Sequence, residues 1–240
     1  MEIPKITQTE LIELINSSQL PTVYLKNLDL SGLSLPIPYK AFQIENCILH
    51  NTIMPEGSFY GNFMLKKCDI RNTKFPKTFY AKDGLNIEEC SFNDDTFFPN
   101  LIVGCYLVLS KMDLSNFDIP SVKDGKAEIY KCNFSAQTRF VGDISKYVTI
   151  KYCNINNLIM PATLYGLTLT QCTHQAGFKM PETLGSLTIS YCHLKNIDIS
   201  SIKEQLVIGE GCKIENSIFP QRVLILQTHD TAILTNISYR

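Results

Sequence analysis

Cysteine recurs along this chain at nearly constant intervals, and this spacing constrains the fold more than any other feature. Eight of the nine cysteines, with a methionine in one place, follow each other at steps of 19 to 22 residues. The column consists of Cys47, Cys68, Cys90, Met112, Cys132, Cys153, Cys172, Cys192 and Cys212. A repeat of about 20 residues cannot bury its own apolar side chains, so successive units must stack on one another. The spacing therefore predicts a solenoid.

The apolar positions around each cysteine predict the shape of one repeat. Apolar residues stand five and three positions before the cysteine, as in Phe42 and Ile44, which is the period-2 pattern of a short strand. Further apolar residues stand two and seven positions after it, as in Leu49 and Met54. Inward positions are thus five residues apart, which fits neither a helix nor an uninterrupted strand. We expect a chain that turns a corner every five residues.

Asparagine and proline mark further points of each repeat. Asn stands four positions after the cysteine in six units, and Asn tolerates left-handed backbone and bonds to its own turn. These residues are Asn51, Asn72, Asn116, Asn157, Asn196 and Asn216. Pro follows at or next to the eighth position in seven units, where its missing N–H marks the end of a strand-like side. The Asn column therefore predicts a corner.

Three stretches resemble pentapeptide-repeat proteins. They are Val23-Tyr-Leu-Lys-Asn-Leu-Asp-Leu-Ser-Gly-Leu-Ser-Leu, Cys68-Asp-Ile-Arg-Asn-Thr-Lys-Phe and Met112-Asp-Leu-Ser-Asn-Phe-Asp-Ile. The resemblance spans residues 22–226 and implies a mainly β fold, a right-handed parallel β-helix solenoid of about ten coils of 19–22 residues. The chain departs from the family in its large residues five positions before the cysteine and in a fourth side of variable length.

A short bacterial leucine-rich repeat is the alternative architecture. Leu184-Gly-Ser-Leu-Thr-Ile-Ser-Tyr-Cys-His-Leu fits its pattern of leucines, and the preceding unit fits as well. In other units the first leucine of that pattern is replaced, for example by Tyr39, Tyr60 or Lys82. The β-helix is therefore favoured over a leucine-rich-repeat horseshoe, and both are strand-rich solenoids.

The two ends of the chain differ from the repeats. Residues 1–20 are expected to form an N-terminal capping helix, with Leu11, Ile12 and Ile15 on one side and Thr7 or Thr9 as N-cap. Residues 21–226 form the predicted solenoid and residues 227–240 a C-terminal cap. The apolar segments 223–226 and 232–234 break the cysteine register. We expect them to form the last strands and, lacking a polar cap, to contact another chain or a further domain.

The sequence contains no recognisable catalytic, metal or cofactor site. The motifs G-x-S-x-G and H-E-x-x-H and a phosphate loop are absent, and the four histidines lie in different units. No two cysteines are closer than 15 residues, which is unlike zinc-binding pairs. We expect free, buried thiols, with Cys105 outside the column and exposed. His174 takes an inward position as a packed core residue.

One surface pattern is a candidate binding site. Lysine and tyrosine recur at the two positions before the cysteine column, so stacking aligns them into a stripe that suits a protein or anionic partner. Its residues are Lys66, Lys67, Lys111, Tyr130, Lys131, Lys151, Tyr152 and Tyr191. Glu45, Glu88 and Glu89 interrupt this stripe.

The function expected is a non-enzymatic protein–protein interaction scaffold that binds another protein, including a host protein. Repeat domains of both families occur in bacterial effectors, so the resemblance implies an effector or its targeting domain. A DNA-mimicking topoisomerase inhibitor would need a strongly acidic surface, whereas the formal net charge is −1. A β-helix enzyme with an unrecognised site is the remaining alternative. We expect no nucleic-acid partner, no membrane span, and a cytosolic location or secretion into a host cell without a classical signal peptide.

Overall fold

The chain forms a parallel β-solenoid of about ten turns with one N-terminal helix, as the cysteine repeat predicts. The computed structural model describes residues 3–37, 40–123, 125–135, 137–142, 146–227 and 231–240. Two compact units make up the chain, a first unit of residues 1–112 and a second unit of residues 113–240.

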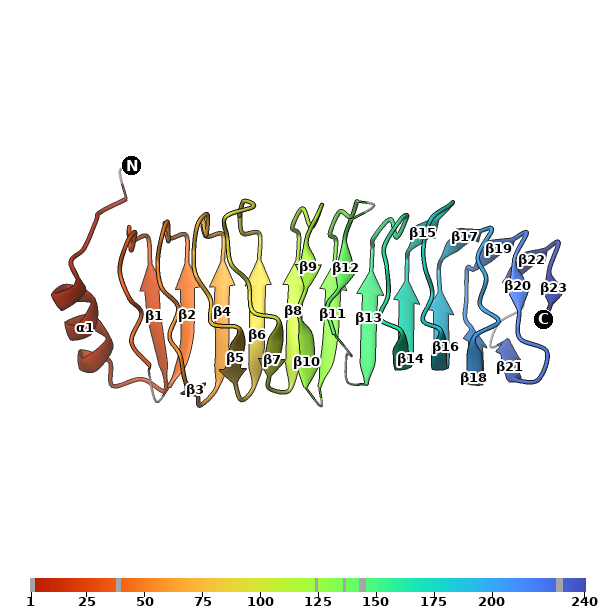
Figure 1. Ribbon diagram of the computed structural model, residues 1–240, viewed down its shortest axis with the longest axis horizontal. Helices are drawn as coiled ribbons and strands as arrows, with labels where there is room; N and C mark the ends of the chain where they lie inside the picture. The colour runs from red at the N-terminus through yellow and green to blue at the C-terminus, as the bar shows by residue number, and fades with distance from the viewer. Residues whose placement is uncertain (1–2, 38–39, 124, 136, 143–145, 228–230) are drawn as a thin grey trace. The chain divides into compact units, whose positions relative to one another are not determined.

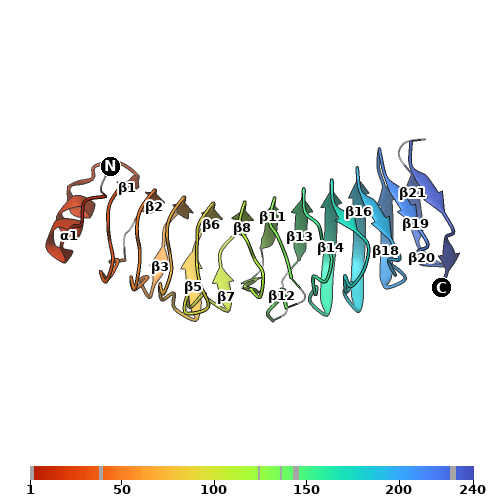
Figure 2. The same ribbon diagram turned by 90° about the horizontal axis from the view of Figure 1, so that it is seen from above.

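The first unit stacks its long strands into one parallel sheet (Figure 1). These strands are β1 (Thr22–Lys26), β2 (Ala41–Glu45), β4 (Asn62–Lys66), β6 (Gly84–Glu88) and β8 (Tyr106–Ser110). A shorter parallel sheet consists of β3 (Ser58–Phe59), β5 (Thr78–Ala81) and β7 (Leu101–Val103). Figure 2 shows β5 and β7 on one side of this unit and β6 and β8 on the other. Each turn therefore carries strands on more than one side.

The second unit repeats this arrangement. Its long strands are β11 (Lys126–Tyr130), β13 (Tyr147–Lys151), β14 (Thr163–Thr170), β16 (Thr183–Ser190), β18 (Ile202–Ile208) and β21 (Leu224–Gln227). A second sheet pairs β15 (Thr173–His174), β17 (His193–Lys195), β19 (Lys213–Glu215) and β22 (Ile233–Thr235). The short strands are β9 (Asp118–Ile119), β10 (Ser121–Lys123), β12 (Arg139–Phe140), β20 (Ile218–Phe219) and β23 (Ser238–Tyr239). The predicted C-terminal cap contains β22 and β23, which pair in parallel with β19 and β20.

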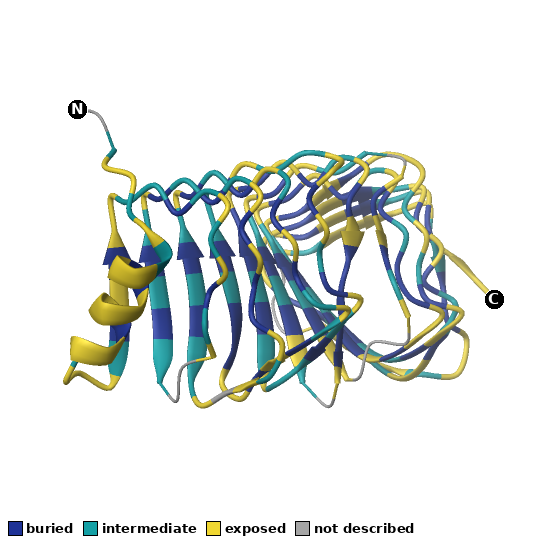
Figure 3. Cartoon of the chain, turned by 60° about the vertical axis from the view of Figure 1, so that its left-hand side comes forward, coloured by how far each residue is buried: buried dark blue, intermediate teal, exposed yellow. Residues whose placement is uncertain are grey.

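Alternating burial along the strands explains why these residues form a stacked core. In β2 and β4 the second and fourth residues are buried and the others half-buried, as the colours of Figure 3 show. Register pairs Phe42 with Phe63 and Phe63 with Leu85, so residues five positions before the cysteine form one inward column. Adjacent rings pack together, with centroids 5.7 Å apart for Phe42 and Phe63. The predicted period-2 strands are confirmed.

Two columns of left-handed residues turn each coil. The predicted Asn corners are confirmed, because these six residues have φ between 50° and 62°. The residue before the cysteine column forms a second left-handed corner, but its side chain varies, as in Lys67 (φ 53°), Tyr152 (φ 58°) and Gln171 (φ 51°). Left-handed backbone is costly for residues other than Gly and Asn. This second corner was not predicted.

The cysteine column is buried, reduced and hydrogen-bonded. Its eight thiols are free and buried, whereas Cys105 is exposed, as predicted. A cysteine N–H donates to the sulfur one coil further on, at 3.4 Å from Cys68 to Cys90 and from Cys172 to Cys192. Each thiol also faces backbone carbonyls, as Cys192 does Leu169 at 3.4 Å. Burial raises the pKa of Cys47 and Cys153 to about 12, so these thiols remain protonated.

Helix α1 (Gln8–Ser17) packs at the start of the first unit. Thr7 is its N-cap and forms a capping box with Glu10. Leu11 and Ile15 are buried, whereas Ile12 is 41% exposed. These three positions span about 100° around a helix, so Ile12 lies at the edge of the side predicted from the sequence and is partly open to solvent.

The strands distinguish the β-helix from the horseshoe. A leucine-rich repeat has one strand per repeat followed by a helix or 3₁₀ segment. Here α1 is the one helix among the described residues, and single turns carry two strands, as β16 and β17 do. The β-helix type of solenoid is therefore confirmed.

Candidate protein interface

The candidate stripe lies along the second corner column, where the chain leaves the long sheet. Lys67, Lys111, Lys131, Tyr152 and Tyr191 all have φ between 52° and 58°. Successive corners are joined by backbone hydrogen bonds, such as the one from the N–H of Lys131 to the carbonyl of Lys151 at 3.0 Å. The fold therefore aligns these side chains from coil to coil within each unit.

In the first unit the stripe is an ion-pair network. The ammonium group of Lys111 lies 2.8 Å from a Glu88 carboxylate oxygen and 2.6 Å from one of Glu89. Lys66 approaches Glu88 at 3.6 Å, and Lys67 approaches Glu89 at 3.8 Å. The hydrogen bonds from Lys111 lower the pKa of both glutamates, and those carboxylates raise the pKa of Lys111. The two glutamates thus neutralise much of the lysine charge here.

In the second unit the stripe is cationic and aromatic. The rings of Tyr130 and Tyr152 meet edge to face with centroids 5.1 Å apart. The ammonium group of Lys131 lies 5.2 Å and 5.6 Å from these two centroids, within the range of a cation–π contact. Neither Lys131 nor Lys151 forms an ion pair with any residue that the structure describes. Among the carboxylates that the structure describes, none therefore neutralises these two charges at ion-pair distance.

Tyr191 continues the same corner column two coils beyond Tyr152. Gln171 occupies the corner between them, and the backbone hydrogen bonds run from Gln171 to Ser190 and from Tyr191 to Glu210. The Tyr191 hydroxyl donates to the Glu210 carboxylate, which raises the pKa of the phenol. Half of the Tyr191 side chain remains exposed. At this point of the column an exposed aromatic ring thus lies next to an acidic group, and Gly211 is the corner residue of the next coil.

Seven of the eight predicted residues therefore fall into two groups with different surroundings, and the eighth, Tyr191, contacts Glu210. Lys66, Lys67 and Lys111 share the network of the first unit, whereas Tyr130, Lys131, Lys151 and Tyr152 cluster in the second. Gln171 and Gly211 belong to the same corner column, and Gln171 and the neighbouring Glu210 were missed. Gln171 stands directly before Cys172, so the spacing rule could have found it. Glu210 stands two positions before Cys212, where Lys66 and Tyr130 stand in their coils, so the same rule could have found it.

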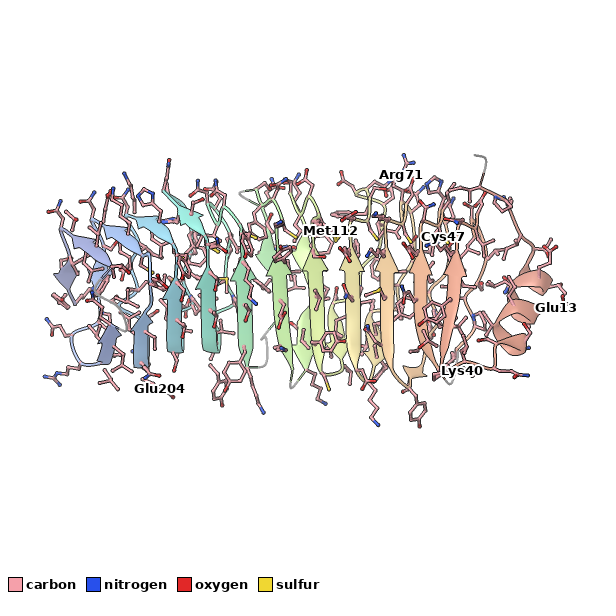
Figure 4. All side chains as sticks on the ribbon, turned by 180° about the vertical axis from the view of Figure 1, so that it is seen from behind. Glu13, Lys40, Cys47, Arg71, Met112 and Glu204 are labelled. Atoms are coloured by element: carbon pink, nitrogen blue, oxygen red, sulfur yellow. The ribbon has the colours of Figure 1, made fainter. Side chains whose placement is uncertain are left out.

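Histidines contact carboxylates at two exposed places. His50 lies 2.8 Å from Asp69, which also binds Arg71 at 2.6 Å; Figure 4 labels Arg71 at the edge of the first unit. Burial opposes ionisation of Asp69, but the hydrogen bonds from Arg71 and His50 outweigh it and lower its pKa. His193 lies 4.0 Å from Glu215, whose pKa is lowered by Lys213 and Lys195.

Neither a metal centre nor a membrane-spanning helix is visible in the described part of the chain. Its His, Cys, Asp and Glu side chains form no group of three that could hold a metal ion. Its helix is also too short and too polar to cross a membrane. Neither protein-family models, nor curated proteins, nor solved structures match this chain.

Proposed function

We propose that this chain is a non-enzymatic scaffold that binds an acidic segment of another protein through the stripe of its second unit. The proposed contact residues are Tyr130, Lys131, Lys151, Tyr152 and Tyr191. Tyrosine supplies rigid contact area at low conformational cost, and lysine supplies charge complementarity. We assign a stabilising role to the lysines of the first unit, because they already form ion pairs with Glu88 and Glu89.

This proposal rests on a comparison of the residue types at the two left-handed corners. At one corner Asn recurs in six coils, and Asn adopts left-handed backbone at a low cost in energy. The other corner has Lys131, Tyr152 and Tyr191 at nearly the same φ. Strained positions that retain costly side chains are common at functional sites. The side chains of the second corner are therefore better explained by what they contact than by the turn that they form.

The spacing of the column limits the size of its occupant. Three coil steps separate Lys131 from Tyr191, which corresponds to about 14 Å at the spacing of paired strands. An extended peptide covers this length with about four residues. Carboxylates near Lys131 and Lys151 and an apolar or aromatic side chain near Tyr152 would complement the surface. Glu210 disfavours a carboxylate at the Tyr191 end.

Two finer assignments rest on the sequence resemblance alone. We assign the chain to the right-handed, pentapeptide-repeat type of β-helix and propose that it acts as a bacterial effector or the targeting domain of one. Its place of action would be the bacterial cytosol or, after export without a classical signal peptide, a host cell. Fusion to a translocation reporter tests export, because the reporter is expected to be active inside host cells only when the secretion system is intact.

The interface is tested with defined peptides. Fluorescence anisotropy would compare a labelled set of Glu- and Tyr-containing peptides of about eight residues with the same set carrying Gln in place of Glu. We expect binding of the acidic set only, and weaker binding at higher salt. The double variant K131E/K151E should bind at least about 10-fold more weakly, as expected for two central contacts. Its thermal stability should change little, because both changes are at the surface.

K179E/K203E is the matched control, because it makes the same change of charge at two exposed residues of the same unit outside the stripe. It should leave peptide affinity within about 2-fold of the wild type, which is below 0.5 kcal/mol. Equal weakening by the control would indicate only a general attraction of charge. Equal binding of acidic and Gln peptides, or undiminished binding by K131E/K151E, would refute the proposed interface.

A further inference from the structure

The last coil of the second unit has an unusual distribution of apolar side chains. This coil contains β21, β22 and β23, and each of these strands pairs on one side only among the described residues (Figure 1). All described residues of the three strands are exposed. The large apolar ones are Leu224, Ile225, Leu226, Ile233, Leu234 and Tyr239, with exposures between 36% and 59%.

Three of these residues continue the inward columns of the coil before. Ile225 pairs with Leu206, Leu234 with Ile214 and Tyr239 with Phe219. The three partners are at most 1% exposed because the last coil covers them. Ile225, Leu234 and Tyr239 therefore form an apolar end surface of the same composition as the interior.

Two of the other three residues, Leu224 and Ile233, lie on outward positions that are polar in the coil before, and the third, Leu226, lies on an outward position that is apolar there. Leu224 takes the place of Gln205 and of Ser186, and Ile233 takes the place of Lys213. Leu226 follows Val207, which in turn follows Thr188. One further coil stacked on β21 would bury the inward residues but would not by itself account for apolar residues on the outside. The outward leucines call for an occupant that also places apolar side chains beside them.

The segment Leu224-Ile225-Leu226 has a palindromic sequence. Two copies of it can therefore pair as antiparallel strands with equivalent residues facing each other. If two copies of β21 pair antiparallel about a two-fold axis at Ile225, Leu224 lies opposite Leu226 of the other copy. Directly opposed residues of antiparallel strands have Cβ atoms about 5 Å apart, so the outward leucines would shield each other. Ile225 would face its own copy inside a core continuous through both chains. The free edge of β21 would then be paired, which removes an aggregation risk.

We propose that this coil is a homodimer interface, in which two copies of the chain join end to end through antiparallel pairing of β21. The six apolar side chains present about 600 Å² per copy, so a dimer that covered all of them would bury about 1,200 Å², which reaches the range of specific interfaces. The interface is isologous, because the same residues contribute from both copies. It would present two candidate stripes in one assembly, which raises avidity for a partner with repeated acidic segments.

The mass of the intact protein in solution provides the first test. Light scattering coupled to gel filtration, at about 1 to 100 µM protein, should give twice the 27.2 kDa of one chain. The double variant L224E/L226E should shift the dimer to monomer or weaken it at least about 30-fold, because like charges would then face each other across the axis. Thr188→Glu, on the same outward face two coils earlier, should remain dimeric. A monomeric wild type, or a dimer unaffected by L224E/L226E, overturns the proposal.

A disulfide tests the position of the two-fold axis without disturbing the surface charge. Directly opposed residues in antiparallel strands have Cα atoms about 4.5–5.5 Å apart, which permits a disulfide. Ile225→Cys in a C105S background should therefore form a covalent dimer under mild oxidation, whereas Thr188→Cys in the same background should not. Equal cross-linking by both variants, or none by Ile225→Cys in a protein of dimeric mass, overturns the proposed register.

Discussion

Replacing Cys192 tests whether the cysteine column acts as a hydrogen-bonding column or only as small apolar filling. The Cys192 side chain is 1% exposed, and its sulfur accepts the backbone N–H of Cys172 at 3.4 Å. The same sulfur lies 3.4 Å from the carbonyl of Leu169 and 3.2 Å from that of Ser190. The backbone hydrogen bonds of the described residues give the Cys172 N–H no second acceptor. Removal of the sulfur therefore leaves a buried donor without a partner.

The expected magnitudes follow from these contacts. In Cys192→Ala, the unsatisfied N–H costs about 1–3 kcal/mol and the lost sulfur burial adds about 1 kcal/mol, giving about 2–4 kcal/mol of destabilisation. Cys192→Ser retains an acceptor and a donor at the same place and should cost about 1–2 kcal/mol. If the column were only apolar filling, the order would be reversed, because burying a hydroxyl is less favourable than burying a methyl group.

Two measurements separate these explanations. Urea unfolding followed by circular dichroism gives the stability order, provided that the slope with urea is unchanged between variants. Hydrogen exchange gives the local effect, since the Cys172 amide should lose protection in Cys192→Ala and keep it in Cys192→Ser. Cys105→Ser is the control and should lie within about 0.5 kcal/mol of the wild type, because Cys105 is exposed. An alanine variant as stable as the serine variant would refute the hydrogen-bonding role.

Three further changes test other parts of the fold. Gln171→Asn should stabilise the chain by about 0.5–1 kcal/mol in urea unfolding, because Asn adopts the left-handed corner at less cost; no gain would undermine the strain argument. Burial lowers the pKa of His174 below 6.5, so the unfolded chain binds more protons and stability falls as pH drops from about 6.5 toward the folded pKa. His174→Leu should flatten this dependence in melting temperatures measured between about pH 7.5 and 5, where imidazole titrates. Thr7→Ala removes the N-cap of α1 and should cost about 1 kcal/mol, with faster amide exchange confined to the first turn of the helix.

The inward columns could be predicted from the sequence because each column needs the same kind of side chain in every coil. Residues such as Phe42, Phe63 and Leu85 need only be apolar and of similar size to stack. The Asn corners were equally readable, since few residues adopt left-handed backbone cheaply. The hydrogen bonds of the thiols were not readable, because they depend on a second corner directly before each cysteine that orients its N–H toward the next coil.

The sequence was sufficient to locate the candidate stripe but not to predict the contacts of its side chains. The spacing put Lys66, Lys67 and Lys111 in one region, as the structure has them, but their contacts depend on the reach of flexible side chains between coils. Glu88 and Glu89 appeared as interruptions of a stripe, whereas they bind its lysines. Met112 takes the place of a cysteine in the column but differs from it chemically, because its thioether has no proton to donate. Figure 4 labels Met112 and Cys47, which follow the ends of β8 and β2 in the same way.

The positions that depart from the repeat are the informative ones for function, because the repeat accounts for the rest. Any stacked coil needs buried residues such as Leu206, and these would be the same for any partner. Folding alone does not explain Tyr152 at a left-handed corner, nor Leu224 on an outward position that is polar in the two preceding coils. The first choice costs backbone energy, and the second costs solubility. A chain selected only to fold and stay soluble would lose both, so their joint presence in the second unit supports two separate contacts, one along the stripe and one at the last coil.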